Sequence, residues 1–216
     1  MTAIRVLVSG FEPFGNDACN PSQRAVDALR GMAVPGVTLR TVVLPTQFGA
    51  SRVTLDAVLT EWPADIVLSV GLAGGRSGLS LERIAINLED ARIPDNAGQQ
   101  PVDRPVVAGA PAAYFTTLPI KAMAAAIRGA GVEASISHSA GTFVCNHVFF
   151  AMCHLAATTR PGMRCGFIHI PWLPEQAASH GGPSLDTESV VRGLVAALSA
   201  VVAGGPEPQT PEGALS

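Results

Sequence analysis

Strand-like and helix-like segments alternate along almost the whole chain, and this alternation constrains the fold more than any other feature. Residues 65–70 form a nearly all-apolar run, which is typical of a strand covered on both faces. Further strands are expected at residues 4–8, 37–44, 81–88, 132–137 and 165–171. Helices are expected at residues 21–29, 48–59, 121–129, 145–158 and 187–202. The pattern predicts an α/β fold: a single-domain three-layer α/β/α sandwich with a twisted, mostly parallel (mixed) sheet and helices on both faces.

Composition bounds the organisation of the chain. Of the 216 residues, 48% are hydrophobic and only 14% carry a charge, which excludes a disordered polyampholyte and supports a large core. We expect one domain over residues 1–204 and a flexible tail at residues 205–216. A formal net charge of −3 without any basic run disfavours nucleic-acid binding. No apolar run approaches the ~20 residues of a membrane span, and no signal-peptide cleavage site follows the first one, so a cytoplasmic protein is expected.

Cys145 has the strongest local case for a chemical role among the four cysteines. It follows a strand-to-helix turn and should open the next helix, where the helix dipole and free backbone N–H groups lower a thiol's pKa and can bind an oxyanion. Cys153 and Cys165 fall inside an expected helix and strand and are interpreted as buried structural thiols, whereas Cys19 lies in a loop. Without a CxxC pair or an export signal, free thiols are expected rather than disulfides.

A nucleophilic thiol needs a base, and the chain has five histidines. His138 ends an expected strand just before the Cys145 turn, and His169 alternates with apolar residues near the end of another strand. The pattern does not rank one over the other. His147 and His154 are seven residues apart and could share a helix face as a metal pair, but no further ligand cluster supports this, so structural histidines are favoured.

A third group should orient the base and stabilise its charged form. The same central segment also carries Arg92, a fixed cation that could face a developing oxyanion or form a salt bridge to a neighbouring carboxylate. The acidic candidates are Glu82, Glu89, Asp90 and Asp95.

Five groups of residues then stand in a fixed order within residues 5–202: Gly10-Phe-Glu-Pro-Phe-Gly with Asn20-Pro-Ser, Gly74-Gly-Arg, Asp90-Ala-Arg-Ile-Pro-Asp-Asn, Ser139-Ala-Gly-Thr-Phe-Val-Cys-Asn, and Phe167-Ile-His-Ile-Pro-Trp-Leu-Pro-Glu-Gln. Together they closely resemble the pyroglutamyl peptidase I family, also called pyrrolidone carboxyl peptidase. Members of this family are cysteine exopeptidases that remove an N-terminal pyroglutamate (5-oxoproline). A single short motif would carry little weight, but five in register are highly specific.

The resemblance also implies roles for individual residues. It implies a catalytic triad of Glu82, Cys145 and His169, which decides between the two candidate histidines. It places Arg92, with the backbone N–H of Cys145, at the oxyanion. Some family members have glutamine at the position of Leu72, where this chain can offer only its main chain. The implied pocket for the lactam ring consists of Phe11, Phe14, Asn20, Thr46, Leu72, Ile93, Phe143 and Val144.

The function that the resemblance implies is hydrolysis of the amide bond after pyroglutamate, through a pyroglutamyl thioester on Cys145 and without a metal or cofactor. The expected partners are peptides with an N-terminal pyroglutamate, with no nucleic acid and no membrane, and the family suggests a homotetramer. Two alternatives stay open: a cysteine amidase acting on another small amide, and a non-catalytic module that binds pyroglutamyl peptides. A long connection at residues 95–111 is expected either at an interface or over the site.

Overall fold

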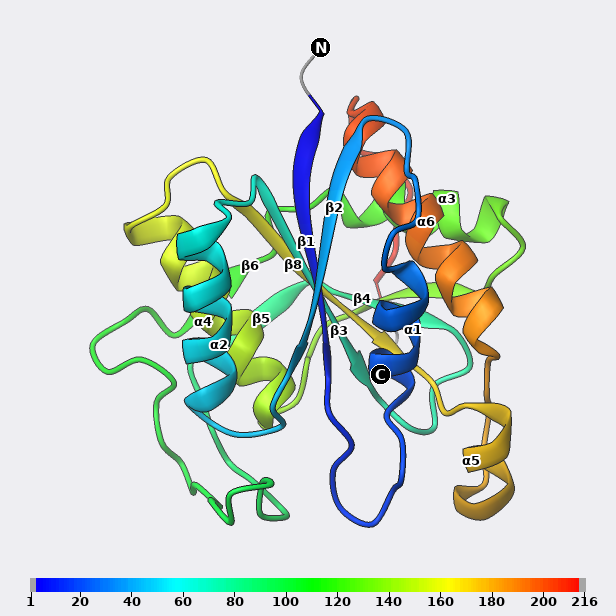
Figure 1. Ribbon diagram of the computed structural model, residues 1–216. Coiled ribbons are helices and arrows are strands. Elements are labelled where there is room, and N and C mark those ends of the chain that lie inside the picture. Colours follow the sequence, from blue (N-terminus) through cyan, green and yellow to red (C-terminus); the bar gives the residue numbers. More distant parts are fainter. Residues whose placement is uncertain (1–2, 214–216) are drawn as a thin grey trace.

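A six-stranded sheet forms the middle layer of the molecule, whose computed structural model describes residues 3–213 (Figure 1). The strand order is β2-β1-β3-β8-β4-β7. From β2 to β8 the strands run parallel, whereas β4 is antiparallel to β8 and parallel to β7. The expected mixed, mostly parallel sheet is therefore confirmed. The strands are β1 (Ile4–Phe11), β2 (Val37–Leu44), β3 (Ile66–Leu72), β4 (Leu79–Glu82), β7 (Ala134–Ser137) and β8 (Arg164–Ile170).

Helices cover both faces of this sheet, as the alternation predicts. In Figure 1, α2 and α4 lie on one side of the strands and α1, α3 and α6 on the other. Strand side chains alternate between two apolar clusters: Val6 and Val8 pack toward α1 and α6, and Leu7 packs toward α2 and α4. The three-layer sandwich is thus confirmed. The helices are α1 (Pro21–Leu29), α2 (Ala50–Glu61), α3 (Ile120–Gly129), α4 (Val144–Thr158) and α6 (Thr187–Ala203).

The junction of β1 and α1 shows how local sequence fixes this geometry. Asn20 is the N-cap of α1, since its side chain accepts a hydrogen bond from the backbone N–H of Ser22, and Pro21 stands in the first turn. Gly10 lies directly under the helix start, where a Cβ would be 2.5 Å from the carbonyl oxygen of Ser22. Only glycine therefore allows α1 to pack this closely on β1.

The single strand expected at residues 81–88 is wrong, because the chain changes sheets at Arg83. The segment forms β4 in the main sheet and then β5 (Ile84–Ile86), which pairs with β6 (Ala113–Phe115) in a separate two-stranded sheet. Arg83 donates its N–H to the carbonyl of Ser137, while its own carbonyl accepts from the N–H of Thr116. Side-chain alternation continues across this point, so the pattern alone predicts one strand.

A short helix, α5 (Pro174–His180), was not expected from the pattern. Its seven residues are too few for an apolar repeat, although Pro174 in the first turn is a helix-start signal. His180 stacks on Trp172 with ring centroids 4.2 Å apart, and its Nε2 lies 2.8 Å from a carboxylate oxygen of Asp17. α5 therefore braces the loop between β1 and α1.

The connection at residues 95–111, drawn in green below α2 and α4 in Figure 1, is held by polar side chains. Buried Asp95 accepts hydrogen bonds from the backbone N–H groups of Phe48 and Gln99, both at 2.8 Å. Arg104 forms an ion pair with Glu89 at 2.7 Å. Whether this connection lies at an interface or covers the site stays a prediction.

The described part of the C-terminal tail contacts α3. The backbone N–H of Lys121 donates to the carboxylate of Glu207 at 3.1 Å, and Arg128 pairs with Glu212 at 2.8 Å. Flexibility of residues 205–216, and a domain boundary at residue 204, stay predictions.

Candidate active site

Glu82 and His169 form a buried hydrogen-bonded pair across the junction of β4 and β8. Nδ1 of His169 lies 2.7 Å from Oε1 of Glu82, and both side chains are almost wholly buried. The antiparallel register sets Ser80 opposite His169, so Glu82, two residues further on, faces the same side of the sheet. A carboxylate at Nδ1 selects the tautomer in which Nε2 can accept a proton.

Cys145 is the second residue of α4, as the sequence predicts, and it lines one pocket together with His169. Its sulfur rests on Gly71 of β3, where a Cβ would lie 2.8 Å from Sγ. Gly71 in turn pairs with His169 in the register of β3 and β8. The thiol therefore stands over the strand beside the imidazole.

Burial, rather than the helix terminus, dominates the charge state of the Cys145 thiol. Burial and then the negative charge of Glu82 raise the pKa of Cys145 to about 12, against smaller opposing effects of Arg76 and its own backbone N–H. Burial also lowers the pKa of His169, although the hydrogen bond to Glu82 acts in the other direction. The expected lowering of the thiol pKa is therefore wrong for the resting site. Both shifts favour the uncharged forms of the thiol and of the imidazole, which line the same pocket.

Of the two histidines that the pattern left unranked, His169 is the one in the pocket. His138 is exposed and lines a different hollow beside β7. Sequence spacing could not separate them, because the pairing of β4 with β8 is a long-range contact.

The pocket at Cys145 encloses about 250 Å³ and is mostly apolar. Phe14 and Phe143 form one wall with ring centroids 6.1 Å apart, and Phe48 braces Phe143 edge-on at 5.4 Å. Phe11 contributes from the end of β1 and packs on Phe167 below it. The sequence-predicted residues that line this pocket are Phe11, Phe14, Asn20, Thr46, Leu72, Phe143 and Val144, with Cys145 and His169.

Asn20 and Thr46 shape the pocket wall through a shared acceptor. Nδ2 of Asn20 and Oγ1 of Thr46 both donate to the carbonyl of Glu12, at 3.0 and 2.8 Å. Oδ1 of Asn20 accepts hydrogen bonds from the backbone N–H and the hydroxyl of Ser22 at the start of α1. These side chains hold the loop that carries Phe14, and Asn20 and Thr46 also line the pocket.

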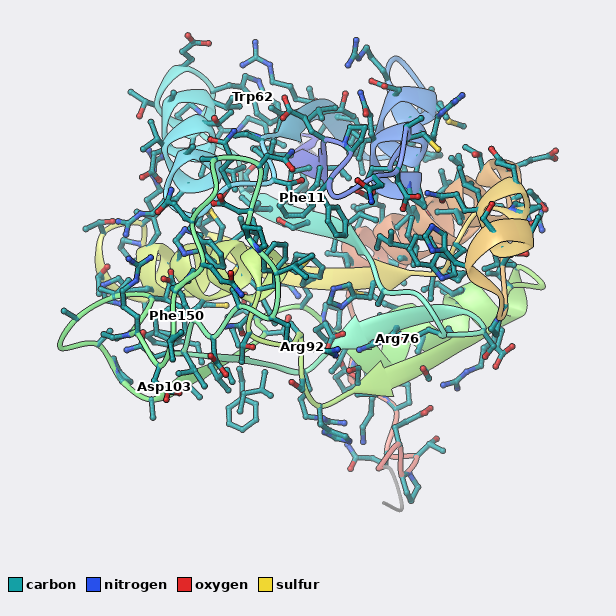
Figure 2. The ribbon with its side chains drawn as sticks, turned by 90° about the horizontal axis from the view of Figure 1, so that it is seen from below. Phe11, Trp62, Arg76, Arg92, Asp103 and Phe150 are labelled. Carbon is teal, nitrogen blue, oxygen red and sulfur yellow. The ribbon has the colours of Figure 1, made fainter. Side chains whose placement is uncertain are left out.

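Arg92 and Ile93 lie outside this pocket. Both are exposed and line an adjoining hollow that shares Gly141 and Phe143 with it. Figure 2, which looks at this end of the molecule from below, shows Phe11, Arg76 and Arg92 labelled around its centre. Arg92 forms no ion pair with Glu89 or Asp90 within residues 3–213. The arginine that does line the Cys145 pocket is Arg76, which sequence reasoning missed although it closes the Gly74-Gly-Arg motif.

The remaining acidic candidates have other partners. Glu89 contacts Nδ1 of His147 at 2.6 Å as well as Arg104, and Asp95 holds the 95–111 connection. Asp90 is exposed. Only Glu82 among the four reaches the histidine of the pocket.

No three His, Cys, Asp or Glu side chains within residues 3–213 gather closely enough to hold a metal ion. His147 binds Glu89 and also accepts from the N–H of Gly49, whereas Nδ1 of His154 lies 2.9 Å from the hydroxyl of Tyr114. The two rings thus have separate partners, which fits the structural interpretation. Across the same described residues no helix is long and apolar enough to cross a membrane.

The other thiols are unconnected with the pocket. Cys153 on α4 and Cys165 on β8 are buried and free, with sulfurs 3.3 Å apart. Cys19 is half-buried in its loop. The structural interpretation of Cys153 and Cys165 agrees with this placement.

A cysteine and a histidine at one apolar pocket, with a buried glutamate behind the histidine, are the arrangement of a cysteine hydrolase. Comparison with known proteins narrows that class. A family model described as pyroglutamyl peptidase matches residues 4–203, so the chain belongs to the pyroglutamyl peptidase family.

Individual relatives agree with this assignment. The chain is 53% identical over 201 residues to a pyrrolidone-carboxylate peptidase of Levilactobacillus brevis. The aligned region covers 92% of this chain and 98% of the relative. It is 54% identical over 194 residues to pyrrolidone-carboxylate peptidase 1 of Ralstonia nicotianae. That aligned region covers 89% of this chain and 90% of the relative. The crystal structure of pyroglutamyl peptidase I from Bacillus amyloliquefaciens superposes with a TM-score of 0.94 at 40% identity, over 97% of this chain and 100% of that one. The structure of a mutant pyrrolidone carboxyl peptidase from Pyrococcus furiosus superposes with a TM-score of 0.89 at 40% identity. The superposition covers 93% of this chain and 99% of that one.

Proposed function

We propose that the chain is a cysteine exopeptidase that hydrolyses the amide bond after an N-terminal pyroglutamate. The observation that carries the proposal is that Cys145 and His169, with Glu82 buried behind the histidine, line a small aromatic-walled pocket. Its volume of about 250 Å³ suits a single small ring rather than a stretch of peptide. Pyroglutamate is such a ring, neutral and without a free amine.

The first half of the reaction transfers the pyroglutamyl group to sulfur. His169 takes the thiol proton of Cys145 at Nε2, and the sulfur attacks the carbonyl carbon that joins pyroglutamate to the next residue. The backbone N–H of Cys145, in the first turn of α4, faces the developing oxyanion, and one such donor typically contributes about 3–4 kcal/mol of barrier reduction. Arg92 is a second proposed donor, which has to turn from its adjoining hollow to reach the oxyanion. The C–N bond then breaks as His169 gives its proton to the leaving amine, and a thioester remains.

The second half uses the same groups in reverse. His169 takes a proton from water, the hydroxide attacks the thioester carbonyl, and the C–S bond breaks to release pyroglutamate and restore the thiol. Glu82 holds the imidazole in its working tautomer and stabilises its charged form throughout. Both steps use only the side chains of Cys145, His169 and Glu82, backbone donors, the substrate and water.

Recognition of the lactam rests on apolar walls and a few hydrogen bonds. Phe11, Phe14 and Phe143 flank the ring, and Leu72 adds an apolar contact. The remaining N–H of Asn20 and the backbone serve the ring amide. Proline lacks the ring carbonyl, so it would leave those donors unpaired and is expected to be rejected.

The test is release of aminomethylcoumarin from its pyroglutamyl derivative under reducing conditions, with the prolyl derivative as control. Wild type should cleave only the pyroglutamyl substrate, and Cys145→Ser should lose at least ~10³-fold in kcat because serine is not activated by a histidine matched to a thiol. Wild-type turnover in Cys145→Ser would remove Cys145 from its role. Cleavage of another small amide alone would favour the amidase, and binding of a pyroglutamyl peptide without turnover would favour the binding module.

We further infer that the chain is a cytoplasmic homotetramer, as membership of the pyroglutamyl peptidase family suggests. Light scattering after size-exclusion chromatography tests the assembly. A monomer at assay concentrations would contradict it.

A further inference from the structure

Arg76 shares one oxygen of Glu82 with His169. Its Nη1 lies 2.8 Å from Oε1, the same atom that contacts Nδ1 of His169 at 2.7 Å. The other oxygen, Oε2, has no hydrogen-bond partner within residues 3–213. Glu82 is fully buried, and a buried carboxylate needs a paired cation. Arg76 supplies that compensating charge beneath the imidazole.

The local chain leaves Arg76 little freedom of position. Two glycines precede it: Gly75 has a φ of 88°, and a Cβ on Gly74 would lie 2.4 Å from Nε1 of Trp172. A second guanidinium nitrogen, Nη2, donates to the carbonyl of Ser139 at 3.4 Å. The guanidinium therefore spans from Glu82 to the turn that leads into α4, and 29% of the Arg76 side chain is exposed.

Arg76 and Glu82 act in opposite directions on both reacting groups. Burial is the largest influence on the pKa values of Cys145 and His169; beyond it, Glu82 raises both and Arg76 lowers both. Removal of Arg76 would take away one of the influences that oppose Glu82 at both groups. The other charged or titratable groups near this site line adjoining hollows: His138 beside β7, and Asp90 and Arg92 beyond Phe143.

We propose that Arg76 is a positioning residue of the peptidase: it pairs with the Glu82 carboxylate and aims it at Nδ1 of His169, which leaves Nε2 to take the thiol proton. This inference rests on the proposed function. Arg76 acts through Glu82 rather than on the scissile bond, because its two hydrogen-bonded partners are Glu82 and Ser139.

The variants are Arg76→Gln, which removes the charge, and Arg76→Lys, which keeps it. Arg52→Gln is the matched control, since Arg52 lies on α2 and its ion-pair partner within residues 3–213 is Asp56 at 3.5 Å. In Arg76→Gln both limbs of the pH profile of kcat/KM should move to higher pH by about one unit, and kcat at neutral pH should fall about tenfold with little change in KM. Arg76→Lys should return both limbs toward wild type, and Arg52→Gln should change nothing.

A second readout needs no substrate. The rate at which iodoacetamide alkylates Cys145, followed by peptide mass mapping, should shift to higher pH in Arg76→Gln and return in Arg76→Lys. If wild type failed to cleave pyroglutamyl substrates, the proposed function would be wrong. The pH dependence of alkylation would still test whether Arg76 acts on Cys145 and His169. An unmoved alkylation profile in folded Arg76→Gln overturns the proposal, as does a change confined to KM with both limbs unmoved. If Arg76→Gln did not fold, Arg76→Lys still decides: its limbs should stay near wild type, and moved limbs contradict the proposal.

Discussion

The smallest residue at the site sets the position of its sulfur. Gly71 has ordinary strand geometry, so its importance lies in the missing side chain: an added Cβ would be 2.8 Å from both Sγ of Cys145 and the ring of Phe167. Gly71→Ala should therefore displace the thiol or the ring under it. Because displacement by about 1 Å can cost about 10²-fold in rate, we expect kcat to fall by that order while KM changes little.

The matched control for this prediction is Gly129→Ala at the end of α3, where an added Cβ meets nothing within 4 Å. That variant should keep wild-type kcat and unfold at the same or slightly higher urea concentration. Wild-type activity in folded Gly71→Ala would show that the sulfur is not held by this contact.

Single residues were predictable from the sequence where their chemistry depends on local structure. Cys145 follows a turn and opens a helix, and Asn20 precedes a proline at a helix start, so both could be placed from neighbouring residues. His169 could not be preferred over His138 from pattern, because Glu82 reaches it only through the pairing of β4 with β8. The role of Arg76 could not be predicted for the same reason, because its pairing with Glu82 depends on tertiary packing.

At the level of elements, a polar cluster around the buried Glu89 fixes α4 to its surroundings. His147 on α4 contacts Glu89, which also pairs with Arg104 in the 95–111 connection. Nε2 of His147 accepts a hydrogen bond from the backbone N–H of Gly49 at the start of α2. Burial alone would raise the pKa of Glu89, but the hydrogen bonds from His147 and Arg104 outweigh it and hold that pKa below its usual value. The cluster thus ties three segments of the site's framework together.

This lowered pKa gives a prediction about stability and pH. A carboxyl group whose pKa is lower in the folded state stabilises the fold above its unfolded pKa, about 4.3 for Glu, and loses that contribution as pH falls through the folded pKa. Glu89→Gln should lower the free energy of unfolding at neutral pH by about 1–3 kcal/mol, and the difference from wild type should shrink in acid. Urea unfolding at neutral and acid pH measures it, with Glu61→Gln at the exposed end of α2 as control. A difference independent of pH would contradict the assignment.

Elements with a full period of side chains were predictable, and those that depend on partners were not. The buried run in β3 and the amphipathic α1 and α6 follow from spacing alone. The division of residues 81–88 between two sheets depends on which carbonyl Arg83 meets, and α5 is too short to show a repeat. These details lie near the site, where the structure is determined by tertiary packing more than by the local sequence pattern.

For the molecule as a whole, the tail offers a test of where the domain ends. The contacts of Glu207 and Glu212 lie on α3, on the opposite side of the sheet from α4 and Cys145. Truncation after Gly204 should leave kcat and KM unchanged and lower the free energy of unfolding by no more than about 1 kcal/mol, because the ion pair involved is partly exposed. Activity assays and urea unfolding of the truncated chain check this, and a loss of turnover would place the tail in the functional unit.

The close fit beneath the sulfur also bears on the order of events in a catalytic cycle. With Gly71 and Phe167 packed against the thiol, an acyl group on Cys145 would extend into the pocket that Cys145 lines. The departing peptide would then leave through the pocket, and the incoming water would approach the thioester carbon from the pocket. Product release precedes hydrolysis in such a scheme, and an amine that occupies the vacated space competes with water for the pyroglutamyl group.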